Sequence, residues 1–149
     1  MRLAIAVRMS EGKRGPEVLI VVGSESDRPV VEEAEKVLRE AGVEYELEVA
    51  SAHRTPERVA ELARGAEGRG FRVVIAAAGL AAALPGVVAA HSRLPVIGLP
   101  VAAGALRGID ALLAIAQMPP GVPVAAVGID AGANAAHLAL RILGRSPER

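Results

Sequence analysis

Residues 17–42 read EVLIVVGSESDRPVVEEAEKVLREAG, and this stretch decides the fold class. It opens with a short run rich in valine and isoleucine that ends at Gly23, as a buried strand does. Residues 28–41 then repeat apolar side chains at helical spacing. Asp27 is suited to the N-cap of that helix, because Pro29 stands in its first turn. The stretch predicts a strand, a polar loop and an amphipathic helix in that order.

The same alternation continues along the rest of the chain. We expect strands at residues 17–22, 44–49, 72–77, 94–99 and 122–127, and helices at residues 28–41, 56–69, 84–91, 107–117 and 131–143. Strands this apolar need cover on both faces, which indicates a five-stranded parallel sheet in an α/β sandwich. No linker or repeat interrupts the pattern, so we predict one domain over residues 17–144, with an extension at 1–16 and a tail at 145–149.

The composition excludes several classes of protein. With 149 residues, 52% of them hydrophobic, the chain can bury a sizeable core and is not disordered. Its 17 basic and 17 acidic side chains cancel, which argues against a nucleic acid or an anionic membrane as partner. One Tyr and one Phe are too few for a base-stacking single-strand binder. The lack of cysteine excludes disulfides and thiolate nucleophiles, and it fits the cytoplasmic location that we expect.

Residues 73–92 carry no charge and are numerous enough to cross a bilayer. They are rich in alanine, however, and they contain Gly79 and the pair Pro85 and Gly86. A buried strand, a loop and a buried helix explain the segment better, so we predict no membrane span. The apolar run within residues 1–16 is too short for the core of a signal peptide.

Ligands of parallel sheets bind at the carboxyl ends of the strands, which directs attention to the loops there. The first loop is GSESD, residues 23–27, where a glycine, the hydroxyls of Ser24 and Ser26 and a helix N-terminus can hold an anion. The alternative is that Ser26 and Asp27 only cap the helix. The loop is neither a Walker loop nor a G-x-G-x-x-G fingerprint, which disfavours P-loop and dinucleotide-binding proteins.

The second loop is SAHRTP, residues 51–56. A histidine side chain can move a proton in either direction near neutral pH, which makes His53 a candidate acid–base, and Arg54 can form a bidentate pair with a phosphate. The alternative is a surface His-Arg pair in a turn. We expect His91 and His137, which lie in helical stretches, to be packing or surface residues.

The third loop, residues 78–86, has no reactive side chain. Its small residues, Gly79 among them, allow the backbone to approach a ligand closely, although close helix packing explains them equally well. No His, Asp or Glu cluster has metal-ligand spacing, so we predict no metal. The residues alone thus indicate a phosphate-bearing small ligand and one histidine for acid–base chemistry, without naming a reaction.

Five motifs occur in the order and spacing of a known family: GSESD, SAHRTPER, the A-x-LPG loop, PVIGLPV and GIDALLAIAQMPPGVPVAAVGID. Over about residues 17–144 the chain resembles the N5-carboxyaminoimidazole ribonucleotide mutases of purine biosynthesis. The resemblance implies a flavodoxin-like three-layer sandwich, a homo-octamer, a ribonucleotide substrate and no cofactor. Arg54 with Pro56 resembles the bacterial mutases, because the animal-type carboxylases, which take free CO2, usually have Lys at the position of Arg54.

The resemblance also implies roles for single residues. Ser24 and Asp27 would hold the ribose-phosphate part of the nucleotide, with Ser26 assisting. Ser51 and Arg54 would bind phosphate. His53 would be the general acid–base, and Gly79 and Leu80 would contact the substrate from the third loop. The implied reaction releases CO2 from the N5-carbamate, attaches it to C4 of the aminoimidazole and removes the C4 proton through His53.

The chain departs from the family in the third loop, which usually reads AGAGGAAHLPG. Ala83 stands where the family has a second active-site histidine, and Leu80 and Ala77 replace glycines. Ala102 and Ala103 stand where polar residues are common. Two alternatives therefore stay open: a paralogue that carboxylates or decarboxylates another ribonucleotide, and a non-catalytic nucleotide-binding relative. An intact His53 argues against the second, since binding alone does not require it.

Overall fold

Six strands form one sheet in the order β1-β3-β2-β4-β5-β6 in the computed structural model, which describes residues 5–6 and 15–146. The strands are β1 (Ile5–Ala6), β2 (Val18–Val22), β3 (Tyr45–Val49), β4 (Val73–Gly79), β5 (Val96–Val101) and β6 (Ala125–Ala126). The five strands from β3 to β6 are parallel to one another, and their order is that of flavodoxin-like folds. The predicted fold class is confirmed.

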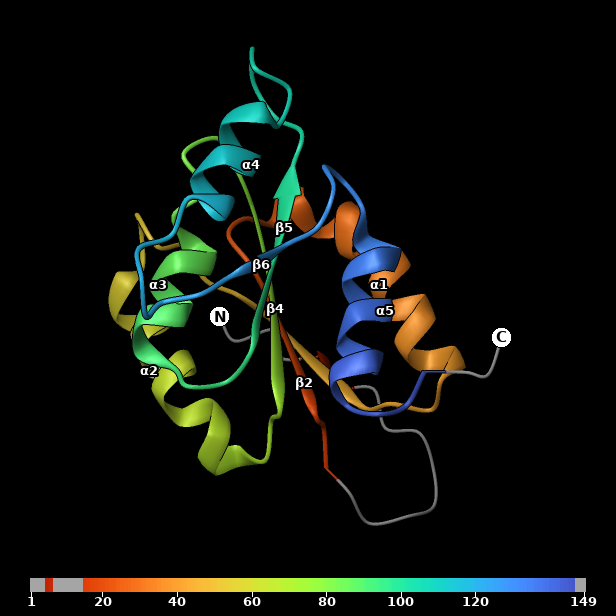
Figure 1. Ribbon diagram of the computed structural model, residues 1–149. Coiled ribbons are helices and arrows are strands. Elements are labelled where there is room, and N and C mark those ends of the chain that lie inside the picture. Colours follow the sequence, from red (N-terminus) through yellow and green to blue (C-terminus); the bar gives the residue numbers. More distant parts are fainter. Residues whose placement is uncertain (1–4, 7–14, 147–149) are drawn as a thin grey trace.

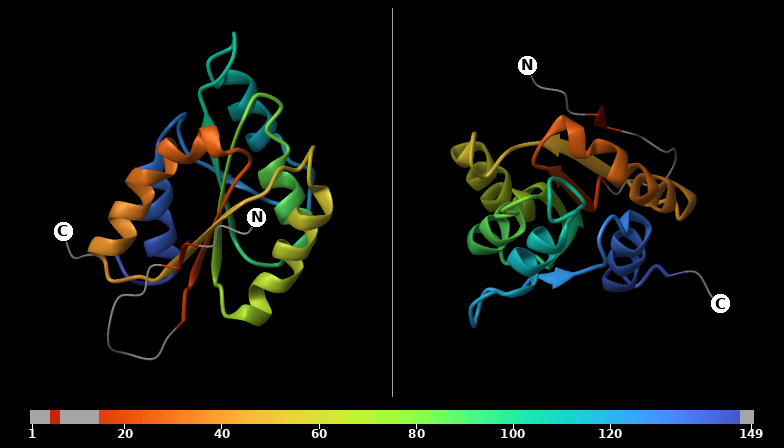
Figure 2. Two further views of the ribbon diagram at one scale, coloured as in Figure 1. Left: turned by 180° about the vertical axis from the view of Figure 1, so that it is seen from behind. Right: turned by 90° about the horizontal axis from the view of Figure 1, so that it is seen from above.

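Helices cover both faces of the sheet, as Figure 1 and the left view of Figure 2 show. One face carries α1 (Arg28–Glu40) and α5 (Gly132–Ile142), and the other carries α2 (Pro56–Ala66), α3 (Leu84–His91) and α4 (Ile109–Ala116). All five residues of β2 are buried. Val18, Ile20 and Val22 face the core under α1 and α5, and Leu19 and Val21 face the core under the other three helices. This period-two division is why a continuous apolar run forms a central strand.

The predicted N-cap of α1 is in the right place, but its side chain makes no capping hydrogen bond. A 3-10 turn, Glu25–Asp27, precedes the helix, and Ser24 caps that turn by accepting from Ser26 N at 3.3 Å. Asp27 itself has helical backbone angles, φ −87° and ψ −7°. A capping side chain needs an extended backbone at its own position, so Asp27 cannot reach back to the helix.

Most expected boundaries agree with the structure to within two residues, and three differences are larger. The helix expected at 56–69 is α2 followed by a 3-10 turn, Glu67–Arg69, that ends at Gly70. The strand expected at 122–127 shortens to β6, because Pro123 has no N–H to donate to a ladder. Residues 5–6, placed by the sequence in an extension, pair antiparallel with β3 as β1. No helix among the described residues is long and apolar enough to cross a membrane.

Ionic side chains lie at the amino ends of the strands and on β3. The carboxylate of Glu17 is buried and pairs with Arg72 at 3.4 Å and with Arg145. The Tyr45 hydroxyl is buried and donates to Oε2 of Glu35 at 2.6 Å. Burial, reinforced by this hydrogen bond and by the charge of Glu35, raises the pKa of Tyr45 to about 12. The two arginines neutralise the Glu17 carboxylate, and the Tyr45 hydroxyl gives the Glu35 carboxylate a hydrogen-bond donor, so both buried acids have partners.

Candidate active site

A cavity of about 420 Å³ opens at the carboxyl ends of the strands, within the usual size range for a small-molecule site. Its walls are the loops that follow β3, β2, β4 and β5, which are neighbours in the sheet. The right view of Figure 2 looks down on this edge. All eight residues that the sequence predicts for the site line the cavity: Ser24, Ser26, Asp27, Ser51, His53, Arg54, Gly79 and Leu80.

The first loop contributes hydroxyl groups and one half-buried carboxylate. The hydroxyls of Ser24 and Ser26 lie 2.9 Å apart. Asp27 folds back over the loop, so that a Cβ added to Gly23 would lie 3.8 Å from its Oδ2. Burial raises the pKa of Asp27, because the charged form loses hydration there. The loop therefore presents two hydroxyls and an acceptor oxygen in front of α1.

The second loop is a turn that its own side chains brace. Ser51 N donates to the Thr55 hydroxyl at 3.0 Å, and Thr55 N donates to Ser51 O at 2.9 Å. Arg54 N donates to the Ser51 hydroxyl at 3.1 Å. His53 and Arg54 project from this turn with exposed side chains. The Arg54 guanidinium makes no ion pair within the described residues, which leaves its charge for an anion. We call the first and second loops (23–27 and 51–55) the polar side of the cavity.

The opposite wall, residues 78–82 with Ala103, is the apolar side of the cavity. Leu80 is 55% exposed and has a left-handed backbone, φ 55°. This is the conformation that glycine adopts without cost, and it explains why a glycine suits this position. The chain keeps the conformation with a leucine, whose Cδ2 lies 2.8 Å from where Gly104 would carry a Cβ.

The backbones of the third and fourth loops approach closely at Gly79. A Cβ at that position would lie 3.1 Å from the Cβ of Ala103 and 3.2 Å from Val101 O. For this loop the sequence allows either close approach to a ligand or close helix packing. In the structure, the close approach at Gly79 packs one loop on the next. The sequence did not single out as site residues six further members of the cavity wall, although four of them lie in the predicted third loop: Ala52, Ala78, Ala81, Ala82, Leu84 and Ala103. Most of them come at or just after the end of a buried strand, and this position was the only signal in the sequence that they line the cavity.

Residues 17–149 match the AIR carboxylase family. The chain belongs to the AIR carboxylase family. It is 61% identical over 128 residues to the N5-carboxyaminoimidazole ribonucleotide mutase of Pyrococcus abyssi, covering 86% of this chain and 74% of that one. The protein of the same name from Thermotoga maritima is 54% identical over 129 residues, 87% of this chain and 75% of that one. The crystal structure of Treponema denticola PurE superposes with a TM-score of 0.78 at 32% identity, covering 87% and 80% of the two chains.

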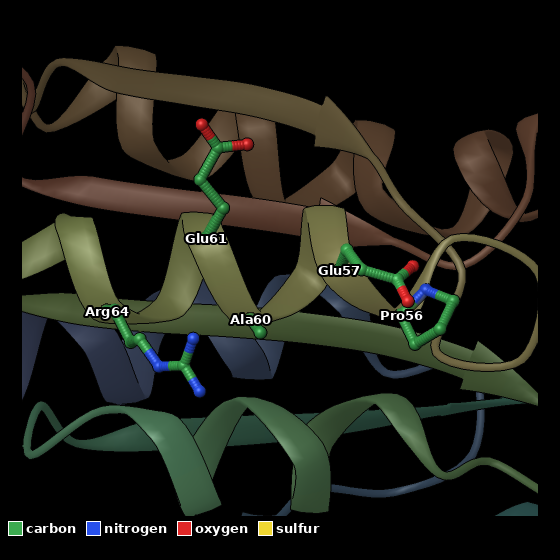
Figure 3. Close-up of a pocket in the computed structure, with 5 residues that line it drawn as sticks. All are labelled: Pro56, Glu57, Ala60, Glu61 and Arg64. Carbon is green, nitrogen blue, oxygen red and sulfur yellow. The ribbon is translucent and has the colours of Figure 1, made fainter.

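A second hollow, of about 560 Å³, lies on the outer surface of this AIR carboxylase domain. Side chains of α2 alone line it, and Figure 3 shows Arg64 extending towards α3 while Glu61 extends the opposite way. Arg64 Nη2 lies 3.3 Å from Nδ1 of His91, and Glu61 pairs with Arg58 at 2.9 Å. Arg64 and Glu61 therefore already have partners, so we place the candidate site in the cavity at the strand ends.

The other two histidines lie outside the cavity, as the sequence predicts. His91 ends α3 beside Arg64, and His137 is exposed on α5. Across residues 5–6 and 15–146, no group of three or more His, Asp or Glu side chains is placed to hold a metal ion. His53 is thus the one histidine of the described chain at the cavity.

Proposed function

We propose that this protein interconverts N5-carboxyaminoimidazole ribonucleotide and 4-carboxyaminoimidazole ribonucleotide in purine biosynthesis. One observation carries the proposal: the turn at residues 51–55 presents His53 and Arg54 to the same cavity as the hydroxyls of Ser24 and Ser26. A base, a cation and hydroxyl donors on one wall suit a nucleotide that must exchange a proton. The mutases of Pyrococcus abyssi and Thermotoga maritima, more than half identical to this chain, support the assignment.

The polar side binds the ribose phosphate. The free guanidinium of Arg54 and the hydroxyl of Ser51 take the phosphate, because charge-assisted hydrogen bonds are the strongest available. The Asp27 carboxylate repels a phosphate but accepts hydrogen bonds from ribose hydroxyls, with the hydroxyls of Ser24 and Ser26 beside it. This division places the base of the nucleotide between the apolar side and His53, which faces the same cavity from the polar side.

His53 carries the proton in both halves of the reaction. It donates to N5 as the N–C bond of the carbamate breaks, which releases CO2 and a neutral amine. C4 of the aminoimidazole then attacks the CO2, and His53 removes the C4 proton as the ring regains aromaticity. The proton given to N5 equals the proton taken from C4, so the reaction is a net isomerisation. The apolar side retains CO2 by excluding water.

A paralogue that carboxylates or decarboxylates another ribonucleotide is the second candidate. The specific observation for it is the apolar side, where Leu80 puts a side chain at the cavity. Ala83, three residues further along the chain, does not line the cavity and offers no side-chain hydrogen bond. A binding protein without turnover is the third candidate. Both candidates share the polar side with the mutase, and they differ from it in the chemistry that the apolar side allows.

The test is a direct assay of purified protein with 4-carboxyaminoimidazole ribonucleotide, followed by its ultraviolet absorbance. We expect His53→Asn to lose about 10²- to 10⁴-fold in turnover while nucleotide affinity is kept, as for a general acid–base. His137→Asn, an exposed histidine on α5, is the matched control and should behave as wild type. Binding without any absorbance change in the wild type would contradict the proposal and direct the search to other ribonucleotides.

We also propose that the protein works as a homo-octamer in the cytoplasm. Support comes from α4 and the loop before it, where Leu106, Ile109 and Leu113 are 56–58% exposed. Contiguous exposed apolar side chains mark interaction surfaces. Light scattering should give the mass of eight chains, and Leu113→Glu should reduce it; a monomeric wild type would contradict the octamer. A fluorescent fusion checks the location, which the lack of cysteine fits.

A further inference from the structure

Three non-glycine residues among those described have a left-handed backbone, and each lies in a different loop at the carboxyl edge of the sheet. They are Leu80 at φ 55°, Arg107 at φ 51° and Asp130 at φ 57°. These loops follow β4, β5 and β6, one residue to each loop. A positive φ is uncommon outside glycine, and such strain persists where surrounding contacts over-determine it. The contacts around Asp130 therefore need an explanation.

Asp130 holds the end of β5 at two points. Its N–H donates to Pro100 O at 2.8 Å, and its Oδ1 accepts from Ala102 N at 2.9 Å. The two contacts flank Val101, the last residue of β5, beyond the end of the short β6. Aspartate tolerates the left-handed backbone better than most residues, so one residue can supply both contacts. Asp130 thus continues the hydrogen bonding along β5 beyond the point where β6 ends.

The held segment reaches the apolar side of the cavity. Ala103 follows Ala102, lines the cavity and packs against Gly79. Gly104 then meets the side chain of Leu80. At the other end of the same loop, Gly108 packs against Ile129 and Ala102. Ala102 and Ala103 therefore connect Asp130 to the wall of the cavity.

We propose that Asp130 is a positioning residue for the apolar side of the cavity. By holding Ala102 it fixes Ala103 and Gly104 against Gly79 and Leu80, and so sets the shape of the wall that faces the base of the nucleotide. Asp130 itself does not line the cavity. The role rests on the proposed function only in naming the base as the group that this wall faces.

Two substitutions separate the acceptor from the backbone. Asp130→Gly keeps the left-handed backbone and removes the acceptor, whereas Asp130→Asn keeps both. We expect Asp130→Gly to speed hydrogen exchange at Ala102 N–H about tenfold, since one hydrogen bond to a charged group is lost. Affinity for the carboxyaminoimidazole ribonucleotide should fall by a similar factor, while affinity for ribose 5-phosphate, held by the polar side, should change less than about twofold. Asp130→Asn should restore both properties.

Three results would overturn the proposal: unchanged exchange at Ala102, an equal loss of affinity for both ligands, or no rescue by asparagine. The exchange measurement uses no substrate, and ribose 5-phosphate tests the polar side alone. A wild type that binds ribose 5-phosphate but does not turn over the nucleotide contradicts the proposed function and leaves the exchange result to decide on Asp130.

Discussion

The polar and apolar sides of the cavity are built by different means. On the polar side, ordinary backbone turns are braced by short side-chain hydrogen bonds, such as Ser51 to Thr55 and Arg54 to Ser51. On the apolar side, Leu80 has a left-handed backbone and its side chain lies against Gly104 of the next loop. The polar side therefore recognises a ligand through the chemistry of its residues, and the apolar side through a shape that distant residues impose.

The largest expected effect is on ligand binding and comes from a substitution on the polar side. We expect Arg54→Ala to weaken binding of ribose 5-phosphate by about 10- to 100-fold, the loss of one or two hydrogen bonds to a charged group. Arg54→Lys should recover part of this, because a point charge cannot make the bidentate pair. Titration calorimetry measures it, and Arg64→Ala on α2 is the control. Equal losses in the two alanine variants would mean that the effect is long-range charge and not a contact.

On the apolar side, Leu80→Gly combined with Ala83→His should raise mutase turnover about tenfold, equivalent to about 1.4 kcal/mol of added transition-state stabilisation. Glycine removes the side chain and suits φ 55°, and histidine adds a hydrogen-bonding group. Steady-state kinetics on 4-carboxyaminoimidazole ribonucleotide measures it. The two single variants, Leu80→Gly and Ala83→His, are the controls. No gain in the double variant would show that the departures from the family do not limit the reaction.

A substitution at Tyr45 tests whether the free energy of unfolding can be changed without affecting either side of the cavity. Tyr45→Phe should lower the free energy of unfolding by about 1 kcal/mol, through the lost hydrogen bond to Glu35. The folded pKa of Tyr45, about 12, exceeds the ordinary value of 10.0, so its stabilisation is complete below pH 10 and is lost as pH rises towards 12. Urea unfolding at pH 8 and pH 11 should show a smaller alkaline loss in the variant. Parallel curves, or a change in ribose 5-phosphate affinity at pH 8, would contradict this.

The smallest effect should come from a substitution at Asp27. We expect it to raise the free energy of unfolding slightly while it weakens nucleotide binding. Its folded pKa is raised from 3.8, so the unfolded state ionises first and folding loses stability as pH rises through these values. Asp27→Asn should remove this cost at pH 7 and raise the free energy of unfolding by about 0.5 kcal/mol or less, while nucleotide affinity falls. Thermal unfolding at pH 7 and pH 3 measures it, and the gain should vanish at the lower pH. A gain at both values would point to packing.

The same contrast explains what the sequence could predict. Ser24, His53 and Arg54 were found because their chemistry is local: polar residues directly follow apolar runs that can only be strands. The apolar side was only partly found, because Ala103 and the conformation of Leu80 depend on contacts between loops far apart in the chain. Asp130 carried no signal, since its partner, Ala102, lies 28 positions away. Strand β1 was missed because a two-residue pairing leaves no periodicity to detect.

The two outermost strands of the sheet, β1 and β6, are each only two residues long. A long open edge strand offers unpaired N–H and C=O groups on which another chain can add its own strand, the first step of aggregation. Here the five-residue β3 has β2 on one side and the antiparallel β1 on part of the other, and β5 has β6 across from Gly98. Within the described residues, each outermost strand thus presents only a short template for edge-to-edge growth.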